Sequence, residues 1–180
     1  MTVHSHLITS GARFAAFAAM ALSVGCATIQ SDSQADSQIS KLQTDVDTQL
    51  VTLISLEDQW ADLNGKTEPE DIKAATEVKA HLSYYGNIDA YNKIDVDLTT
   101  LKLRVDANPD RNTSLIDADL DRMRAGLLGS GPADRTSLRG LHHGGQLSRD
   151  LLVDAEKQFN IQFQSLLAYE TALKPRASGK

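Results

Sequence analysis

The sequence has a single cysteine, Cys26, among its 180 residues. A chain with one cysteine forms no internal disulfide bond, so its fold depends on packing alone. Aromatic residues make up only 5% of the chain, and there are only 4 prolines and 11 glycines. β-branched residues do not dominate either, so this composition favours helices over strands.

The sequence also lacks the short motifs that mark common enzyme sites. It has no Gly-x-Ser-x-Gly nucleophile elbow, no His-Glu-x-x-His zinc motif and no glycine-rich phosphate loop. Acid pairs at helical spacing, such as Asp117 and Asp121, are more often a solvated face than a catalytic pair. We therefore expect a protein that is not an enzyme and that uses no cofactor.

No apolar run reaches the roughly 20 residues that a transmembrane helix needs. The nearest is residues 14–22, which follow a weakly positive start with Arg13 as its one cation and lead through small residues to Cys26. This is the layout of a secretory signal peptide. A buried N-terminal helix is the alternative, and the absence of a polar face along the run argues against it.

Residues 22–26, Leu-Ser-Val-Gly-Cys, resemble the lipobox of bacterial lipoproteins, with Ser23 in place of the commoner leucine. The resemblance implies removal of residues 1–25 and a diacylglyceryl thioether plus an N-terminal acyl chain on Cys26, and several chains give stable anchoring. Ala27 is not aspartate, which by the same resemblance implies an outer-membrane location facing the periplasm. Cleavage without lipidation and a retained N-terminus are the open alternatives.

Removal of 25 of the 180 residues leaves 155, enough for one domain with a core, and changes the net charge from −6 to −7. The negative charge of the chain argues against nucleic acid and against an anionic lipid surface as main partners. Contact with the membrane is therefore expected through the lipid anchor. Residues 26–38 consist of the cysteine followed by small and polar residues, which predict a tether between the lipid and the domain. A helical domain is expected over residues 39–174, followed by a basic tail at residues 175–180.

Apolar residues recur at alternating steps of three and four in the first part of this domain, which predicts one long helix that ends at residues 64–65. Gln49 is the one polar member of the stripe. The stripe could form a coiled coil with another chain, but Leu50 and Ile54 widen it. We therefore expect a helix of an intramolecular bundle, with Trp60 in the core. The apolar members are Ile39, Leu42, Val46, Leu53, Leu56, Trp60 and Leu63.

Further helices are expected along the rest of the domain. Thr67 as a cap and Pro69 in the first turn predict a second helix, which residues 86–87 (Gly-Asn) would end. Residues 88–106 favour a helix over two strands, because five apolar residues share one helical stripe. A fourth helix and a long final helix flank a glycine-rich loop at residues 129–145. The expected fold is an all-α, up-and-down bundle of four to five helices with long first and last helices.

Residues 106–117 resemble an EF-hand calcium loop, in which alternate oxygen ligands surround a hard cation. The matching side chains stand at loop positions 1, 3, 5, 7, 9 and 12: Asp106, Asn108, Asp110, Asn112, Ser114 and Asp117. Arg111 replaces the glycine of the sharp turn, and Asp117 replaces the bidentate glutamate. We therefore expect an ordinary connection between helices, with these residues as a weak candidate calcium site.

The glycine-rich loop gathers positive charge on an acidic chain. Arg135, Arg139, His142 and His143 are weak candidates for binding a phosphate, a cell-wall polymer or an acidic partner, although a solvated linker is the plainer interpretation. His142 and His143, together with the distant His81, could ligate a metal, but adjacent residues rarely bind one ion together.

These patterns predict an outer-membrane-anchored periplasmic lipoprotein with a binding or structural accessory role and an envelope protein as its partner. Small helical lipoproteins that serve envelope machines look similar in size, anchor and helix content, but likeness at that level does not fix function. A calcium- or ligand-binding helical sensor and an envelope hydrolase are the alternatives.

Overall fold

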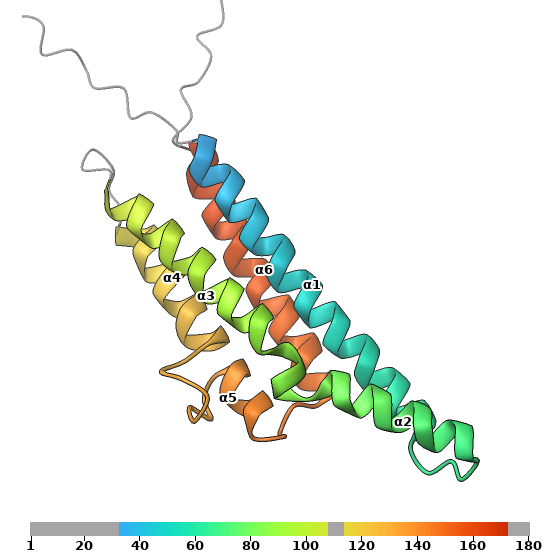
Figure 1. Ribbon diagram of the computed structural model, residues 1–180. Helices are drawn as coiled ribbons and strands as arrows, with labels where there is room; N and C mark the ends of the chain where they lie inside the picture. The colour runs from blue at the N-terminus through green and yellow to red at the C-terminus, as the bar shows by residue number, and fades with distance from the viewer. Residues whose placement is uncertain (1–32, 108–113, 173–180) are drawn as a thin grey trace, which may run out of the picture.

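The computed structural model describes residues 33–107 and 114–172, which form six helices and no strand. The expected all-α bundle with long first and last helices is confirmed, since α1 and α6 have 31 and 24 residues. None of the helices in these ranges is long and apolar enough to span a membrane. The helices are α1 (Ser33–Leu63), α2 (Pro69–Leu82), α3 (Tyr84–Asp106), α4 (Ser114–Leu127), α5 (Leu138–His143) and α6 (Arg149–Ala172) (Figure 1).

Four of these helices form the body of the bundle. α1 packs against α3 and α6, and α4 packs against the same two helices. α1 and α4 run in one direction while α3 and α6 run in the other, so every neighbouring pair is antiparallel (Figure 1). The start of α1 and the end of α6 lie at one end of the bundle, and α5 lies at the opposite end (Figure 1).

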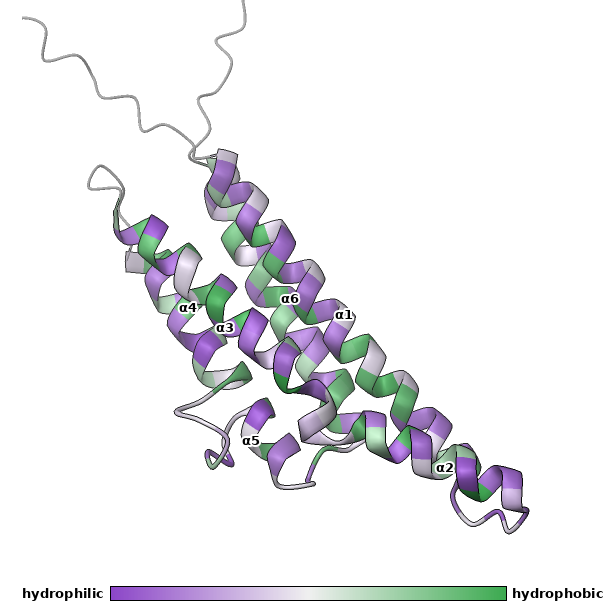
Figure 2. Cartoon of the chain, in the orientation of Figure 1, coloured by the Kyte–Doolittle hydropathy of each residue, from purple (hydrophilic) through white to green (hydrophobic). Residues whose placement is uncertain are grey.

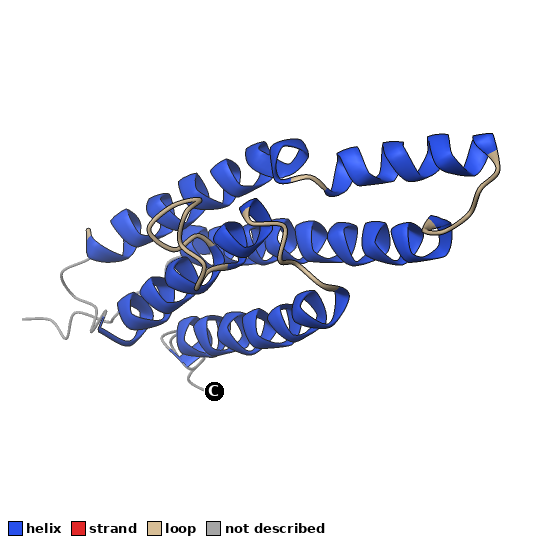
Figure 3. Cartoon of the chain, turned by 90° about the horizontal axis from the view of Figure 1, so that it is seen from below, coloured by secondary structure: helices blue, strands red, loops and turns tan. Residues whose placement is uncertain are grey.

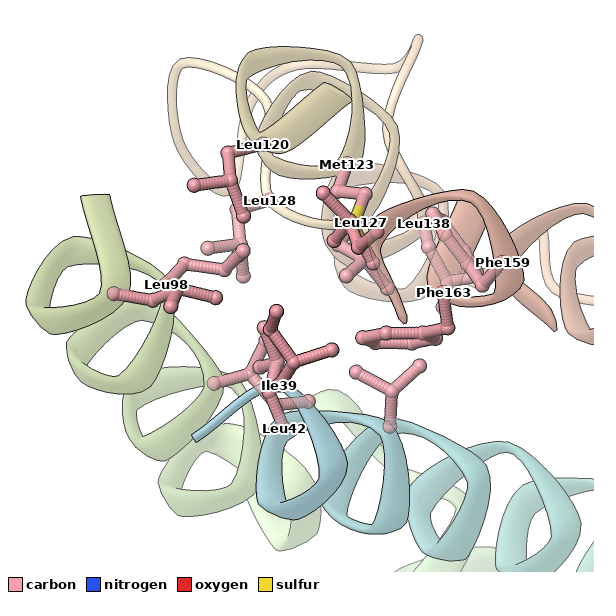
Figure 4. Packing of buried hydrophobic residues seen from close by; sticks show 14 of the residues in the cluster. Ile39, Leu42, Leu98, Leu120, Met123, Leu127, Leu128, Leu138, Phe159 and Phe163 are labelled. Atoms are coloured by element: carbon pink, nitrogen blue, oxygen red, sulfur yellow. The ribbon is translucent and has the colours of Figure 1, made fainter. Parts of the chain in front are cut away.

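One continuous core joins the four helices. Each helix has a hydrophobic and a polar face (Figure 2), as expected for amphipathic helices around a common core. In Figure 4 the core side chains point toward one another from α1, α3, α4 and α6. Labelled examples are Ile39, Leu42, Leu98, Leu120, Met123 and Phe163. The stripe of α1 is therefore covered by helices of its own chain from Ile39 to Leu53, as the intramolecular interpretation predicts.

The end of α1 leaves this body and pairs with α2 in a helical hairpin that extends past the rest of the bundle (Figures 1 and 3). We call residues 57–82 the arm. Val78 is the one buried residue among the 14 of α2. Trp60 lies on the arm and is partly exposed, so the expectation that it belongs to the core is wrong. Here α1 pairs with α2, and α6 reaches it through the ion pair of Arg149 with Asp58 at 2.6 Å, so Trp60 is less covered than the residues of α1 that face the core.

The ends of several helices differ from their expected positions. α1 already includes Ser33, the first described residue and six residues before the expected start, and Ala35 packs into the core. α2 is preceded by Glu68 as its N-cap, and no side chain caps it, so the cap expected from Thr67 is absent. The glycine-rich loop contains a short helix, α5, that sequence periodicity did not reveal. Residues 88–106 are helical as expected, within α3.

The expected stop at residues 86–87 is also wrong. α2 ends at Leu82, and Gly86 and Asn87 lie in the first turn of α3. Ser83 alone separates the two helices: its hydroxyl donates to the carbonyl of Ala80 at 2.7 Å and accepts from the amide of Gly86 at 3.1 Å. A side chain at position 86 would meet the Ala80 carbonyl oxygen at 2.9 Å, so this tight break requires glycine there.

Asn87 stabilises the break from within α3. Its amide nitrogen donates to the carbonyl of His81 (2.7 Å), which the end of α2 leaves without a helical partner, and to the carbonyl of Ser83 (2.9 Å), which also accepts from the amide of Gly86. Its amide oxygen accepts from Nε2 of Gln49, the one polar member of the α1 stripe, at 2.9 Å. This buried pair therefore ties α1 to the junction of α2 and α3.

Replacing Asn87 by alanine is expected to lower the free energy of unfolding by about 1–3 kcal/mol, because Gln49 and the carbonyl of His81 lose their partner. Urea denaturation followed by circular dichroism measures the change. Asn92→Ala, at an exposed position of the same helix, is the control and should leave stability nearly unchanged. Equal effects of the two substitutions would contradict the structural role of Asn87.

Candidate functional site

A hollow of about 560 Å³ opens where the arm meets the body of the bundle. We call it the junction hollow. Its volume lies within the range of ligand pockets. It is lined by residues from α1, α2, α3, α5 and the segment before α6: Glu57, Trp60, Lys79, Leu82, Ser83, Tyr84, Tyr85, His142, His143, Gly145 and Leu147. The hollow and α5 therefore share the end of the bundle that lies away from the start of α1 (Figure 1).

Aromatic residues that carry a polar group are concentrated here. The only tryptophan of the chain, Trp60, and two of its four tyrosines line the hollow, and a third, Tyr91, stacks behind Tyr84 with ring centroids 6.0 Å apart. The ring of His143 meets Tyr84 edge-on at 4.9 Å. Tyr85 is 76% exposed. Exposed tyrosine and tryptophan offer an apolar face and a hydrogen-bonding group together, which suits binding to another molecule.

His142 is buried, and the expectation of a solvated loop is wrong for it. Its Nε2 lies 2.7 Å from the carbonyl of Leu82, and its Nδ1 lies 2.9 Å from the hydroxyl of Tyr91. Since a carbonyl only accepts, Nε2 carries the proton and Nδ1 accepts from Tyr91. Burial lowers the pKa of His142, although the bond to Leu82 acts in the opposite direction. Both ring nitrogens are thus committed to holding α5 against α2 and α3.

Burial also fixes the protonation state of Tyr91. Its side chain is fully buried, which raises the pKa of the phenol, with the neighbouring Tyr84 adding to the effect. The hydroxyl therefore keeps its proton over the physiological pH range and serves as the donor to His142.

A close approach of backbone to backbone holds α5 in place. The hydroxyl of Ser137 caps the helix by accepting from the amide of Gly140 at 3.1 Å. A Cβ atom on Gly140 would lie 1.6 Å from the carbonyl oxygen of Asp134, so only glycine fits. Backbone and hydroxyl donors of Ser130 and Thr136, the Thr136 hydroxyl foremost, lower the pKa of Asp134 to about 2. The charged carboxylate thus organises the turn that leads into α5.

The four candidate binding residues of this region are only partly brought together. His142 and His143 line the junction hollow, and Nε of Arg139 donates to the hydroxyl of Tyr84 at 3.2 Å. Arg135 is not among the lining residues, but its guanidinium lies against Gly144 at the end of α5, 3.5 Å from the amide oxygen of Gln146. The four residues therefore lie around α5, and the two histidines belong to an aromatic cluster.

Two charged groups of the hollow have no partner of opposite charge among the described residues. The ammonium of Lys79 lies over the ring of Trp60, 5.4 Å from its centroid. The carboxyl of Glu57 accepts no hydrogen bond from a described residue, and burial, with a smaller effect of Asp58, raises its pKa. Neither residue was a candidate from the sequence, because only the packing of α2 on α1 brings them together.

The weak candidate calcium loop is only partly described. Asp106 ends α3 and Asp117 lies in α4, whereas Asn108, Asp110 and Asn112 fall outside the described residues, as does Cys26. The ammonium of Lys102 lies 3.9 Å from a carboxylate oxygen of Asp117. Within the described ranges, no group of three or more histidine, cysteine or acidic side chains is placed to hold a metal ion.

No protein-family model, curated protein or solved structure matches the chain. The function is therefore argued from the geometry of the site and from the sequence pattern at the N-terminus.

The fold should lose stability through His142 as the pH falls. Since its pKa is lower in the folded chain than in the unfolded chain, the unfolded chain takes up the proton first, below about pH 6.5. The stability that the neutral His142 ring contributes is therefore complete above about pH 6.5. It is lost as the pH falls from there toward the lower pKa that His142 has in the folded chain. His142→Gln is expected to flatten the decline between pH 7 and 5 in urea denaturation.

The matched control is His143→Gln, because that neighbouring side chain is exposed. We expect it to retain the pH dependence of the unaltered chain. An unchanged slope for His142→Gln would show that the buried ring does not contribute to acid sensitivity.

Proposed function

We propose that this protein is an outer-membrane lipoprotein of the periplasm whose domain binds an envelope protein with the end of the bundle that lies away from its anchor. One observation supports this most directly: the start of α1 and the junction hollow lie at opposite ends of the bundle (Figure 1). Cys26, the expected lipid attachment site, precedes the start of α1 at Ser33 by seven residues. A lipid on Cys26 would therefore be attached seven residues before the end of the bundle that lies opposite the hollow.

The length of α1 gives the scale of this separation. Ser33 and Glu57 are 24 positions apart in one helix, which at 1.5 Å per residue corresponds to about 36 Å. A helical rod of this length holds the hollow clear of the lipid headgroups when its first turn is near the membrane. We infer that the body of the bundle serves as a spacer. We also infer that the end that holds the junction hollow, which we call the distal end, makes the contacts with the partner.

The composition of the distal end favours binding over chemistry. Tryptophan and tyrosine are enriched among the residues that contribute most to protein interfaces. Trp60 and Tyr85 are available for such contacts, whereas His142, which could act as a base in other surroundings, uses both ring nitrogens to fix the fold. A partner that covered the hollow would bury these aromatic groups without rearranging the body of the bundle.

The anchor is tested by Cys26→Ser. This change removes the atom that would carry the thioether, so we expect the chain to move from the outer-membrane fraction to the soluble periplasmic fraction. The control is Ser23→Leu, which restores the commonest lipobox residue and should leave the chain in the membrane fraction. Retention of Cys26→Ser in the outer membrane would exclude the lipoprotein proposal.

Binding at the distal end is tested by site-specific crosslinking in intact cells. A photoreactive phenylalanine analogue at Tyr85 should give a reproducible crosslink to one envelope protein. The same analogue at Ile161, which is 67% exposed on α6, should not give that crosslink. Crosslinks of equal yield at both positions would show that the distal end is not the binding surface.

A further inference from the structure

The turn at the tip of the arm contains the one asparagine of the chain that is followed by glycine, Asn64 before Gly65. This turn joins α1 to α2 at the point of the arm that lies farthest from the body of the bundle (Figures 1 and 3). An asparagine in this position is prone to lose its side-chain amide, because glycine has no side chain to shield its backbone nitrogen from the asparagine side chain. The end of α1 therefore places a chemically labile pair at the tip of the arm.

The hydrogen bonds of the turn leave the reacting atoms of this pair free. The backbone amide of Asn64 donates to the carbonyl of Trp60 at 2.8 Å, and the amide of Lys66 donates to the carbonyl of Leu63 at 3.2 Å. The backbone amide of Gly65 and the side chain of Asn64 form no hydrogen bond with any described residue. The nitrogen that would attack and the amide that would leave are therefore both unrestrained.

The backbone at the tip also has room to rotate. Gly65 has a φ of +91°, and a Cβ atom there would have no other heavy atom within 4 Å. Asn64 and Gly65 are both exposed, at the edge of a hollow of about 280 Å³ along the arm. Since glycine adopts many backbone conformations and segments with few contacts open at little cost in free energy, the glycine nitrogen can approach the asparagine side chain without unfolding of the bundle.

We propose that Asn64 is a site of spontaneous deamidation in the folded protein. The backbone nitrogen of Gly65 gives up its proton and attacks the side-chain carbonyl carbon of Asn64, so that a carbon–nitrogen bond forms and closes a succinimide ring. The bond from that carbon to the side-chain nitrogen breaks, and this nitrogen takes up a proton and leaves as ammonia. One water molecule then opens the ring at either carbonyl, which gives aspartate or isoaspartate. The reaction needs neither a lipid nor a partner, so it is independent of the function proposed above.

The other asparagines of the described ranges lack these features. Each lies within a helix, where the backbone amide of the next residue is held by a helical hydrogen bond, and each is followed by a residue with a bulky side chain. They are Asn87, Asn92 and Asn160. Asn87 is also buried, and its amide nitrogen donates to two carbonyls. These three residues therefore serve as internal references for the reaction.

Deamidation would change both the charge and the shape of the tip. The arm has seven acidic residues and three lysines, hence a net charge of −4, and the reaction adds one further negative charge. The new carboxylate lies at the C-terminal end of α1, where negative charge is unfavourable. Isoaspartate also lengthens the main chain by one carbon between Leu63 and Lys66, whose hydrogen bond closes the turn. The arm should therefore open more readily as the protein ages.

Mass spectrometry of the full chain follows the reaction during incubation at mildly alkaline pH, which favours loss of the glycine amide proton. Trypsin cleaves after lysine, so residues 42–66 form one peptide with a single asparagine. We expect this peptide to divide with time into aspartyl and isoaspartyl forms, while the three reference asparagines keep their amides. The rate should lie within about tenfold of the rate in a synthetic peptide of residues 42–66, because a tip with few contacts opens at little cost.

Asn64→Gln is the matched variant, since it keeps an exposed amide but would have to close a larger ring. Its residues 42–66 should stay unmodified, and hydrogen exchange of the arm should become faster with age in the unaltered chain alone. A rate more than about tenfold below that of the synthetic peptide would overturn the proposal, because the folded tip would then protect Asn64. Equal deamidation at a reference asparagine, or the same mass gain in Asn64→Gln, would also overturn it, since the reaction would not be specific to this turn. Equal exchange in fresh and aged chains would exclude the effect on the arm.

Discussion

The rest of the structure depends on how the backbone carbonyls at residues 80–83 find donors where α2 ends. A helix end leaves carbonyls without helical partners, and a buried group without a partner costs about 1–3 kcal/mol. Backbone amides donate to the first and the fourth of these carbonyls, and the side chains of Ser83 and Asn87 add a second bond to each. Only side chains donate to the other two: Asn87 to the second and His142 to the third. Because every carbonyl is satisfied, the chain can leave its helical path for a single residue. The three donors come from the break itself, from α3 and from α5, so the break and the packing of α5 depend on each other.

The break determines where the candidate site lies. It turns α2 away from the body of the bundle, and the hollow opens between α2, α5 and the end of α1. His142 both fixes the break and lines the hollow, so a substitution there changes stability and binding together. Lys79 and Tyr85 are exposed on the same surface and take no part in the hydrogen bonds of the break. Substitutions at these two positions therefore separate binding from folding.

The sequence predicts the body of the bundle well and its distal end poorly. Periodicity identified the buried stripes of α1 and α3, since packing against neighbouring helices repeats every three to four residues. It misplaced the break because residues 86–87, Gly-Asn, resemble a helix stop, whereas Asn87 acts through its side chain on carbonyls that precede it. His142 was a weak candidate for binding or metal ligation in a loop expected to be solvated, because its burial depends on α5, which has no periodic pattern. Trp60 and Lys79 meet only through the pairing of α1 with α2. Local patterns cannot reveal such a contact.

The distribution of packing along the molecule also bears on how the arm works. In the body, burial of α1 by α3 and α6 provides the main stabilisation, and exposed ion pairs such as Lys93–Asp45 at 2.5 Å add little. The arm has neither a third helix over α2 nor a cluster of buried residues in it. Regions with few buried apolar contacts open at lower free energy than the core, and binding surfaces are drawn from them. A partner that packed on α2 would therefore stabilise it by adding the apolar contacts that the bundle does not supply. The free energy of binding and the stability of the arm would be linked in this way, while the packing of the body would stay unchanged.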